Sequence, residues 1–124
     1  LDLLEYVGIR QFADYQARTL SYGDQRRLEI ARALATDPKL LALDEPAAGL
    51  DSSESRWLGE RLGAARSSGT SMLLIDHDMD LVLQASDTVH VLDFGKRIFA
   101  GTPEEVRSSQ LVIDAYLGTD WEAA

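Results

Sequence analysis

Acidic side chains follow two apolar segments of the chain, each at the point where the apolar run ends. The first run ends at Asp44 and Glu45, in LLALDE, and the second ends at residues 76–78, in SMLLIDHD. Carboxylates can hold Mg²⁺ through oxygen, and carboxylates and imidazoles can both orient a water molecule or take up a proton. In an open parallel sheet, ligands bind at the carboxyl ends of the strands. Polar strand ends are common, but two such ends together predict a functional site there.

A third candidate lies in TLSYGDQRRLEIARAL, where a helix is expected to begin. Ser21 is a good N-cap, and Asp24 follows it at the spacing of a capping box. Gly23 allows a ligand to approach the backbone closely, and the exposed amides of a helix start favour an anion. Capping alone accounts for Ser21 and Asp24. The arginines at 26, 27 and 32 fit a solvated helix face.

Composition narrows the classes of protein that the chain can represent. Its 124 residues, 45% hydrophobic and 27% charged, are typical of one soluble globular domain. The absence of cysteine excludes disulfides and cysteine-based zinc sites. A net charge of −9 argues against a nucleic-acid partner held by counterion release. The apolar runs are too short for a membrane span, which needs about 20 residues, and we expect a cytoplasmic location.

The spacing of apolar residues alternates between helix and strand periods. Helices are expected over residues 1–12, 21–36, 52–67, 79–86, 103–107 and 109–117, and strands over 39–44, 71–76, 88–94 and 96–101. The last two strands form a hairpin joined at Gly95 and Lys96, and Thr102 is expected to cap the helix that follows. Two buried strands around the helix at 52–67 predict an α/β fold with parallel strands, flanking helices and an appended β-hairpin.

Four short motifs, in this order, resemble those of the ATP-binding subunits of ABC transporters. LSYGD resembles the LSGGQ signature, with Tyr22 where the first glycine usually stands and Asp24 in place of glutamine. LLALDE resembles the Walker B strand, AAGLD the D-loop, and IDHD the H-loop with His77 as the switch histidine. Each motif alone is weak or moderate, but the four in order within residues 20–78 are highly specific. The resemblance implies a partial P-loop NTPase fold of ABC type.

Further stretches resemble one group within that family. RRLEIARAL, DEPAAGL, HDMDLV and a tail of GTPEEV with YLG are most like the paired ATPase subunits of branched-chain amino acid importers. The ATPase of lipopolysaccharide export shares the YLG tail and much of the signature region, and HDM favours the importer. The resemblance then implies three parts. Residues 1–36 are the end of the helical subdomain, which carries the signature motif. Residues 37–101 contain the Walker B strand, the D-loop, the H-loop and the hairpin, and residues 102–124 form a helical tail.

The resemblance implies roles for the acids at the first strand end. Asp44 would hold the Mg²⁺ of MgATP through water, and Glu45 would polarise the attacking water as general base. His77 would contact the γ-phosphate and fix Glu45 and the water. Phosphoryl transfer depends mainly on positioning and charge neutralisation, which these side chains supply.

The resemblance also implies partners. Ser21 and the amide of Gly23 would hold the γ-phosphate of ATP bound by a second ATP-binding subunit, in a head-to-tail dimer that Asp51 of the D-loop couples. Transmembrane permease subunits and, indirectly, a solute-binding protein complete such a transporter. The subunit would then lie peripherally on the cytoplasmic face of the cell membrane.

No P-loop motif G-x-x-x-x-G-K-[ST] occurs in these residues: the one Gly-Lys pair, Gly95 and Lys96, is followed by Arg97. We therefore interpret residues 1–124 as about the C-terminal half of a nucleotide-binding domain, and we do not expect ATP turnover by this chain alone.

Three alternatives have weaker support. A chromosome-structure ATPase would show long heptads, a metal-dependent phosphohydrolase would need more ligands than His77 and Asp78, and a non-catalytic interaction module stays open.

Overall fold

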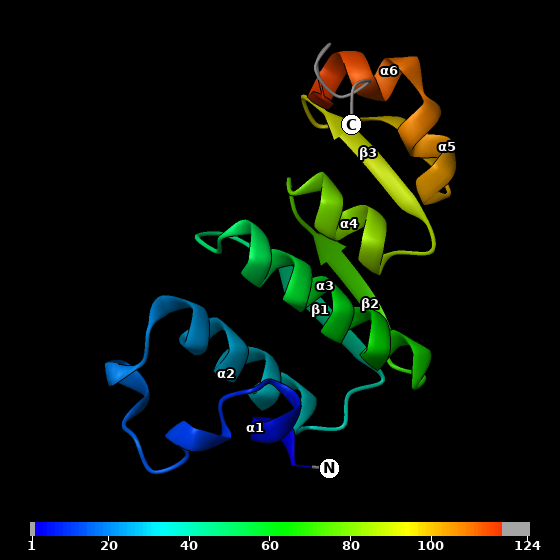
Figure 1. Cartoon of the computed structure of the whole chain (residues 1–124). Coiled ribbons are helices and arrows are strands. Elements are labelled where there is room, and N and C mark those ends of the chain that lie inside the picture. Colours follow the sequence, from blue (N-terminus) through cyan, green and yellow to red (C-terminus); the bar gives the residue numbers. More distant parts are fainter. Residues whose placement is uncertain (1, 118–124) are drawn as a thin grey trace.

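The computed structural model describes residues 2–117, which form an elongated chain of helices and strands (Figure 1). The N-terminal part contains α1 (Leu3–Tyr6), 3-10 turns at Arg10–Phe12 and Ala17–Thr19, and α2 (Tyr22–Leu34). The central part contains β1 (Leu40–Asp44), α3 (Ser52–Ser67), β2 (Ser71–Ile75) and α4 (Met79–Ala85). The C-terminal part contains β3 (Val89–Asp93), β4 (Lys96–Gly101), α5 (Pro103–Ser108), α6 (Gln110–Val112) and a π-helical turn at Ile113–Leu117.

The four strands form two separate pairs. β1 and β2 are parallel and in register from Leu40 opposite Ser71 to Asp44 opposite Ile75. β3 and β4 are antiparallel, with a register shift after Val91. These pairings confirm the predicted parallel unit with an appended hairpin. The hairpin turn differs slightly from the expectation, because Phe94 and Gly95 connect the strands and Lys96 already begins β4.

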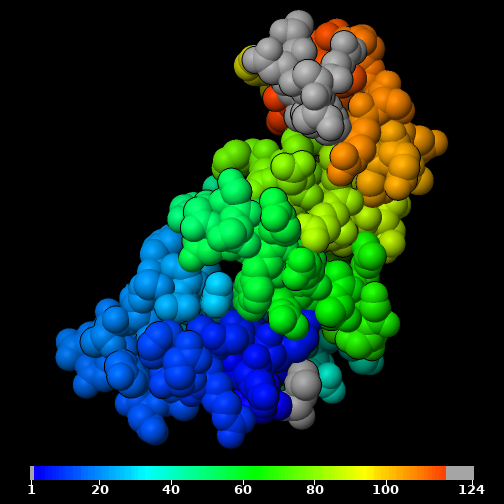
Figure 2. Space-filling view, viewed as in Figure 1, coloured from blue at the N-terminus to red at the C-terminus, as the bar shows by residue number. Residues whose placement is uncertain are grey.

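Helix α3 is the crossover between the parallel strands, and it fills the centre of the main core. Leu58, Leu62 and Ala65 lie on one face of this helix and are buried. Leu41 of β1 and Leu81 of α4 are buried with them, so the helix holds β1 and α4 together. In the space-filling view, α3 and α4 form the middle of the molecule, with the N-terminal helices on one side and the hairpin with α5 on the other (Figure 2).

The N-terminal helix is shorter than the sequence predicts. A single helix over 1–12 was expected, but α1 ends at Tyr6 and Gly8 follows with φ +72. That left-handed conformation favours glycine and cannot continue a right-handed helix. A 3-10 turn at Arg10–Phe12 follows, and Leu1 lies outside the described residues.

The interpretation of the arginines of α2 as solvated is wrong for Arg27. Its guanidinium lies over the ring of Trp57 in α3, 4.3 Å from the ring centroid. Arg61 of α3 in turn lies 5.5 Å from the ring centroid of Tyr6 and 5.7 Å from that of Trp57. These cation–π contacts attach the N-terminal helices to α3.

The C-terminal tail forms short helices, as expected. Thr102 caps α5 in a capping box with Glu105, and Val106 and Val112 are buried against β3. Residues 118–124 of the predicted tail lie outside the described residues. No helix among residues 2–117 is both long and apolar enough to cross a membrane.

One face of the β1–β2 sheet carries no covering element among the described residues. Leu41, Leu43, Met72 and Leu74 face the core, whereas the alternate side chains Leu40, Leu73 and Ile75 are 61%, 55% and 56% exposed. We call these three residues the open face. It borders a groove of about 1000 Å³ that is lined by β2 and β3 and includes Glu45 and His77. Within residues 2–117, the β1–β2 sheet is therefore buried on one face and exposed on the other.

We expect the chain to associate with itself through this open face at high micromolar concentration. Exposed apolar patches and unpaired strand edges favour pairing with another chain. Leu73→Lys should reduce the association without unfolding the chain, because the side chain projects away from the core. Light scattering over a concentration series measures the effect.

Phe94→Lys is the matched control, since Phe94 is 99% exposed but lies in the hairpin turn. A monomer at every concentration would contradict the expectation. So would an equal loss of association in the two lysine variants.

Candidate functional site

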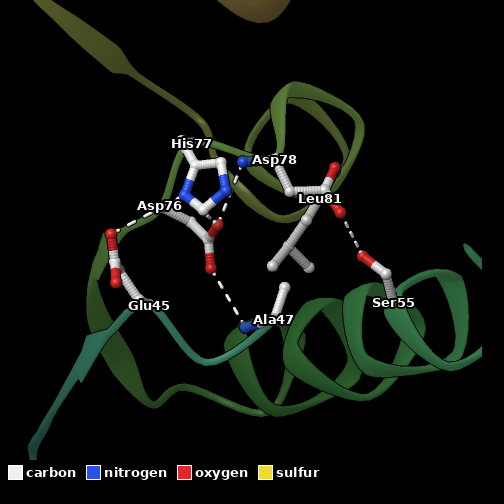
Figure 3. A network of polar contacts seen from close by, with 7 residues as sticks. All are labelled: Glu45, Ala47, Ser55, Asp76, His77, Asp78 and Leu81. Atoms are coloured by element: carbon white, nitrogen blue, oxygen red, sulfur yellow. Dashed lines mark hydrogen bonds and ion pairs between the residues drawn. The ribbon is translucent and has the colours of Figure 1, made fainter. Parts of the chain in front are cut away.

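The ends of β1 and β2 bring two of the predicted site residues together. Beyond the last ladder pair, the amide of Glu45 donates to the carbonyl of Ile75 at 2.7 Å. His77 Nδ1 then lies 3.6 Å from Glu45 Oε1 (Figure 3). The two side chains are 58% and 75% exposed for Glu45 and His77, respectively, so a ligand can reach them from solvent. The geometry puts a carboxylate and an imidazole where both could contact one water molecule.

The backbone of Glu45 is unusual. Its φ of +47 lies in the left-handed region, which non-glycine residues seldom occupy. The following turn is closed by the Ala48 amide, which donates to the carbonyl of Glu45 at 3.1 Å. Strained conformations of this kind cost about 1–3 kcal/mol and concentrate at functional sites. This backbone geometry supports the prediction that Glu45 belongs to a functional site.

Asp76 has a structural importance that the sequence did not reveal. Its side chain is completely buried and accepts hydrogen bonds from the amides of Ala47 at 3.0 Å and Asp78 at 2.9 Å. Its Oδ1 lies 3.8 Å from His77 Nδ1. One carboxylate therefore contacts the turn after β1 and the turn after β2.

Asp78 has a different structural role from Asp76. It is the N-cap of α4 and accepts from the Leu81 amide at 3.1 Å. The hydroxyl of Ser55, a buried residue of α3, donates to its other oxygen at 2.5 Å. Aspartate directly before a helix is a recognised capping signal, and that signal could have identified this role from the sequence.

Asp44 lies at the exposed end of β1. Its carboxylate makes no hydrogen bond or ion pair with any residue in the described range 2–117. Oxygen donors of this kind suit Mg²⁺, which keeps several waters and needs only one or two carboxylates. No group of three or more possible metal ligands occurs within residues 2–117.

The helix start at Ser21 has the predicted capping geometry. Ser21 Oγ accepts from the Asp24 amide at 3.2 Å and donates to the Asp24 carboxylate at 2.7 Å. Gly23 lies close to Glu54, because a Cβ there would lie 2.2 Å from a carboxylate oxygen of that side chain. Sequence reasoning missed Glu54. An anion at this helix start would thus have two carboxylates of the same chain as neighbours.

Tyr22, the departure from the signature pattern, packs against the D-loop segment. A Cβ on Gly49 would lie 2.6 Å from the Tyr22 ring, so the two residues are in close contact. Arg26 donates to the Tyr22 hydroxyl through Nη2 at 2.7 Å and pairs with Glu29 at 2.7 Å. The large side chain therefore links the start of α2 to the turn before α3.

Asp51 caps α3 in a capping box with Glu54, which the sequence analysis did not anticipate. The Asp51 carboxylate accepts from the amides of Ser53 and Glu54, and the Asp51 amide donates to Glu54 Oε2 at 3.0 Å. Hydrogen bonds from the Glu54 amide and the Ser53 hydroxyl hold the pKa of Asp51 below its ordinary value of 3.8. Its cap therefore strengthens when the carboxyl is ionised.

The predicted residues thus form two groups. Glu45 and His77 lie 3.6 Å apart beyond the ends of β1 and β2, and Asp44 is the last residue of β1. Gly23 and Asp51 are linked through Glu54, which contacts both.

Comparisons with known proteins identify the class. Residues 1–48 match the family model described as ABC transporter, and residues 96–122 match that of the branched-chain amino acid ATP-binding cassette transporter. The solved structure of MJ1267, an ATP-binding cassette of an ABC transporter, superposes with a TM-score of 0.81 at 31% identity, covering 94% of this chain and 47% of MJ1267. The fold is that of about half of an ABC-type ATP-binding cassette, and the matched segments are similar in sequence to this family, which confirms the resemblance.

Individual relatives show to which group of ATP-binding cassettes the chain is similar. The high-affinity branched-chain amino acid transport ATP-binding protein LivG of Salmonella typhimurium is 50% identical over 116 residues, covering 93% of this chain and 46% of LivG. The corresponding protein BraF of Pseudomonas aeruginosa is 48% identical, with 93% and 46% covered. The chain spans about half the length of the curated relatives that it matches.

The pKa of Asp51 predicts how stability depends on pH. Because the folded-state pKa is lowered, the contribution of ionised Asp51 is present above about pH 4 and is lost as the pH falls through the folded-state pKa. Asp51→Asn keeps an oxygen acceptor at the cap but does not titrate. The parent should therefore exceed this variant in free energy of unfolding at about pH 5, and the difference should shrink by about pH 3. Urea unfolding followed by circular dichroism measures both.

Ser53→Ala serves as a control, because it removes only one of the donors to the carboxylate. Between about pH 5 and pH 3, the free energy of unfolding relative to the parent should therefore change less for Ser53→Ala than for Asp51→Asn. A difference between parent and Asp51→Asn that is the same at both pH values would contradict the role of the ionised cap.

Proposed function

We propose that this chain supplies the hydrolytic carboxylate, the switch histidine and the signature helix of an ATP-hydrolysing subunit of an ABC transporter. The observation that carries the proposal is the placement of Glu45 and His77, 3.6 Å apart at the ends of two parallel strands. Phosphoryl transfer needs groups that are fixed in place rather than unusual chemistry. A carboxylate and an imidazole held by adjacent strands meet that need.

Glu45 acts as the general base. Its carboxylate takes a proton from the attacking water as the water oxygen bonds to the γ-phosphorus, and the bond from that phosphorus to the leaving oxygen of ADP breaks. His77 holds Glu45 and the water in line and contacts the γ-phosphate. The exposure of both side chains leaves room for water and phosphate.

Asp44 is the residue that would hold Mg²⁺, through water. The cation neutralises charge on the phosphate oxygens. Asp44 suits this role because its carboxylate is exposed and lies beside Glu45 on the same strand end, so one residue faces the metal and the next faces the water.

The second group acts across a dimer. Ser21 and the amide of Gly23 contact the γ-phosphate of ATP that is held by a second ATP-binding subunit, and Asp51 couples the two sites. The link from Gly23 through Glu54 to Asp51 supports a coupling role, because it joins the signature helix to the D-loop within one chain.

Import of branched-chain amino acids is the transport process we propose. Support comes from the family match over residues 96–122 and from the names of LivG and BraF. The subunit then works with permease subunits at the cytoplasmic face of the membrane, and indirectly with a solute-binding protein.

The roles of the two adjacent acids can be separated in a chimera that joins this chain to the part of LivG outside the matched segment. Glu45→Gln should leave MgATP binding nearly intact and slow hydrolysis by about 10²- to 10⁴-fold, the usual contribution of a positioned general acid or base. ATP-bound dimers should accumulate. Asp44→Asn should weaken the Mg²⁺ dependence of binding as well, since it removes charge beside the metal. Steady-state ATPase rates, nucleotide titration and size-exclusion chromatography provide the readouts.

His90→Gln is the control: it also replaces a titratable side chain, but this one lies in β3 of the hairpin. Its rate should match the parental rate. Hydrolysis by Glu45→Gln at the parental rate would refute the assignment of the base. Equal losses of nucleotide binding in the two acid variants would refute the separate assignment of the metal.

A further inference from the structure

Asp76 is the buried carboxylate between the two segments that carry the site. Its side chain has no exposed area, and its two backbone donors come from different turns. Ala47 lies two residues beyond Glu45, and Asp78 lies one residue beyond His77 (Figure 3). The Asp76 carboxylate thus binds the backbone directly beside each of the two proposed reacting side chains.

The position of these bonds matters because the strand ladder has already ended. The pairing of β1 with β2 stops at Asp44 and Ile75, and one further bond joins the Glu45 amide to Ile75. Past that point the two turns are connected through Asp76. Burial strengthens hydrogen bonds, because the dielectric constant inside a protein is low. The distance between the turns therefore depends on this carboxylate.

The imidazole of His77 has little packing to fix it, since 75% of the side chain is exposed. Two carboxylates flank its Nδ1, Glu45 at 3.6 Å and Asp76 at 3.8 Å. Both distances are too long for direct hydrogen bonds, so the turn that carries the ring determines where it lies. Asp76 holds this turn, because it accepts from the next amide along the chain.

Asp78 does not share this position. Its oxygens are bound by the Leu81 amide and the Ser55 hydroxyl, which belong to α4 and α3. Removing that contact would disturb the packing of two helices and leave the turn after β1 untouched. The two aspartates that flank His77 therefore have separable roles.

We infer that Asp76 is a positioning residue for ATP hydrolysis: its buried carboxylate fixes the turn of Glu45 against the turn of His77 and so sets the spacing of the pair. The inference rests on the proposed function of that pair. Asp76 touches neither water nor nucleotide in this role. It acts through the two side chains that do.

The test uses the same chimera with LivG. Asp76→Asn keeps the shape of the side chain but replaces one acceptor oxygen with a donor, which cannot accept from an amide. We expect kcat to fall about 10- to 100-fold, the effect of a misplacement of about 1 Å, with KM for MgATP changed less than about twofold. In the Glu45→Gln background the same substitution should lower the residual rate by less than about twofold, since residues that act as a unit are not additive.

Two further variants separate positioning from stability. Ser55→Ala removes the bond to Asp78 and should lower the melting temperature while kcat stays parental. Asp76→Glu keeps the carboxylate but adds one methylene in a buried place, so kcat should fall, although less than in Asp76→Asn. This variant keeps the test decisive if Asp76→Asn does not fold.

Several results would overturn the inference. They are a parental kcat in Asp76→Asn, an equal fold loss from Asp76→Asn with and without Glu45→Gln, or a loss in Asp76→Glu as large as that in Glu45→Gln. If Glu45→Gln itself hydrolyses ATP at the parental rate, the proposed function fails and this inference fails with it. If Glu45→Gln is slow and Asp76→Asn is not, this inference alone fails.

Discussion

The parallel pairing of β1 with β2 is the constraint on which the site depends. Because the two strands are in register to their last residues, Asp44 lies opposite Ile75 and the next residues of both strands leave the sheet together. Glu45 and His77 are separated by more than thirty positions in the sequence, and this register brings them to 3.6 Å. Helix α3 maintains the pairing, since its buried face packs on β1. A slip of one residue would send the strand's side chains to opposite faces.

Capping interactions connect the site to the helices around it. Ser21 caps α2, Asp51 caps α3 and Asp78 caps α4. Each of these side chains lies in a motif that the ABC resemblance associates with nucleotide. The carboxylates and hydroxyls that end loops and start helices therefore also fix the loops that would contact ATP. One consequence is that a substitution at Asp51 or Asp78 will affect stability, because each carboxylate caps a helix.

Much of the architecture could be predicted from the sequence because local signals agree with the tertiary structure. Apolar runs predicted β1 and β2, and Thr102 marked the start of α5. The predicted length of the N-terminal helix was wrong, because the left-handed conformation of Gly8 ends the helix although the helical spacing of apolar residues continues. Which side chains of the sheet face outward required the structure, because an apolar strand indicates that burial is favourable but does not say which element covers each face.

The site was predicted in part. The residue types at both strand ends indicated Asp44, Glu45 and His77, and the ABC resemblance gave them roles. Asp76 was not distinguished from Asp78, because two aspartates beside one histidine look equivalent in a sequence. Only the fold shows that one carboxylate points into the space between two turns and the other caps α4. Glu54 was missed likewise, since its contact with Gly23 joins distant segments.

The central claim is that Glu45 and His77 act as one unit, and a double-mutant cycle on their ATPase rates measures this directly. In the chimera with LivG, the cycle compares His77→Ala, Glu45→Gln and the double variant with the parent. If the two residues hold the same water, each single variant should lose most of the activity, and the double variant should be no slower than the slower single variant within about threefold. A double variant whose fold loss equals the product of the two single losses would show that the residues act independently and would contradict the account.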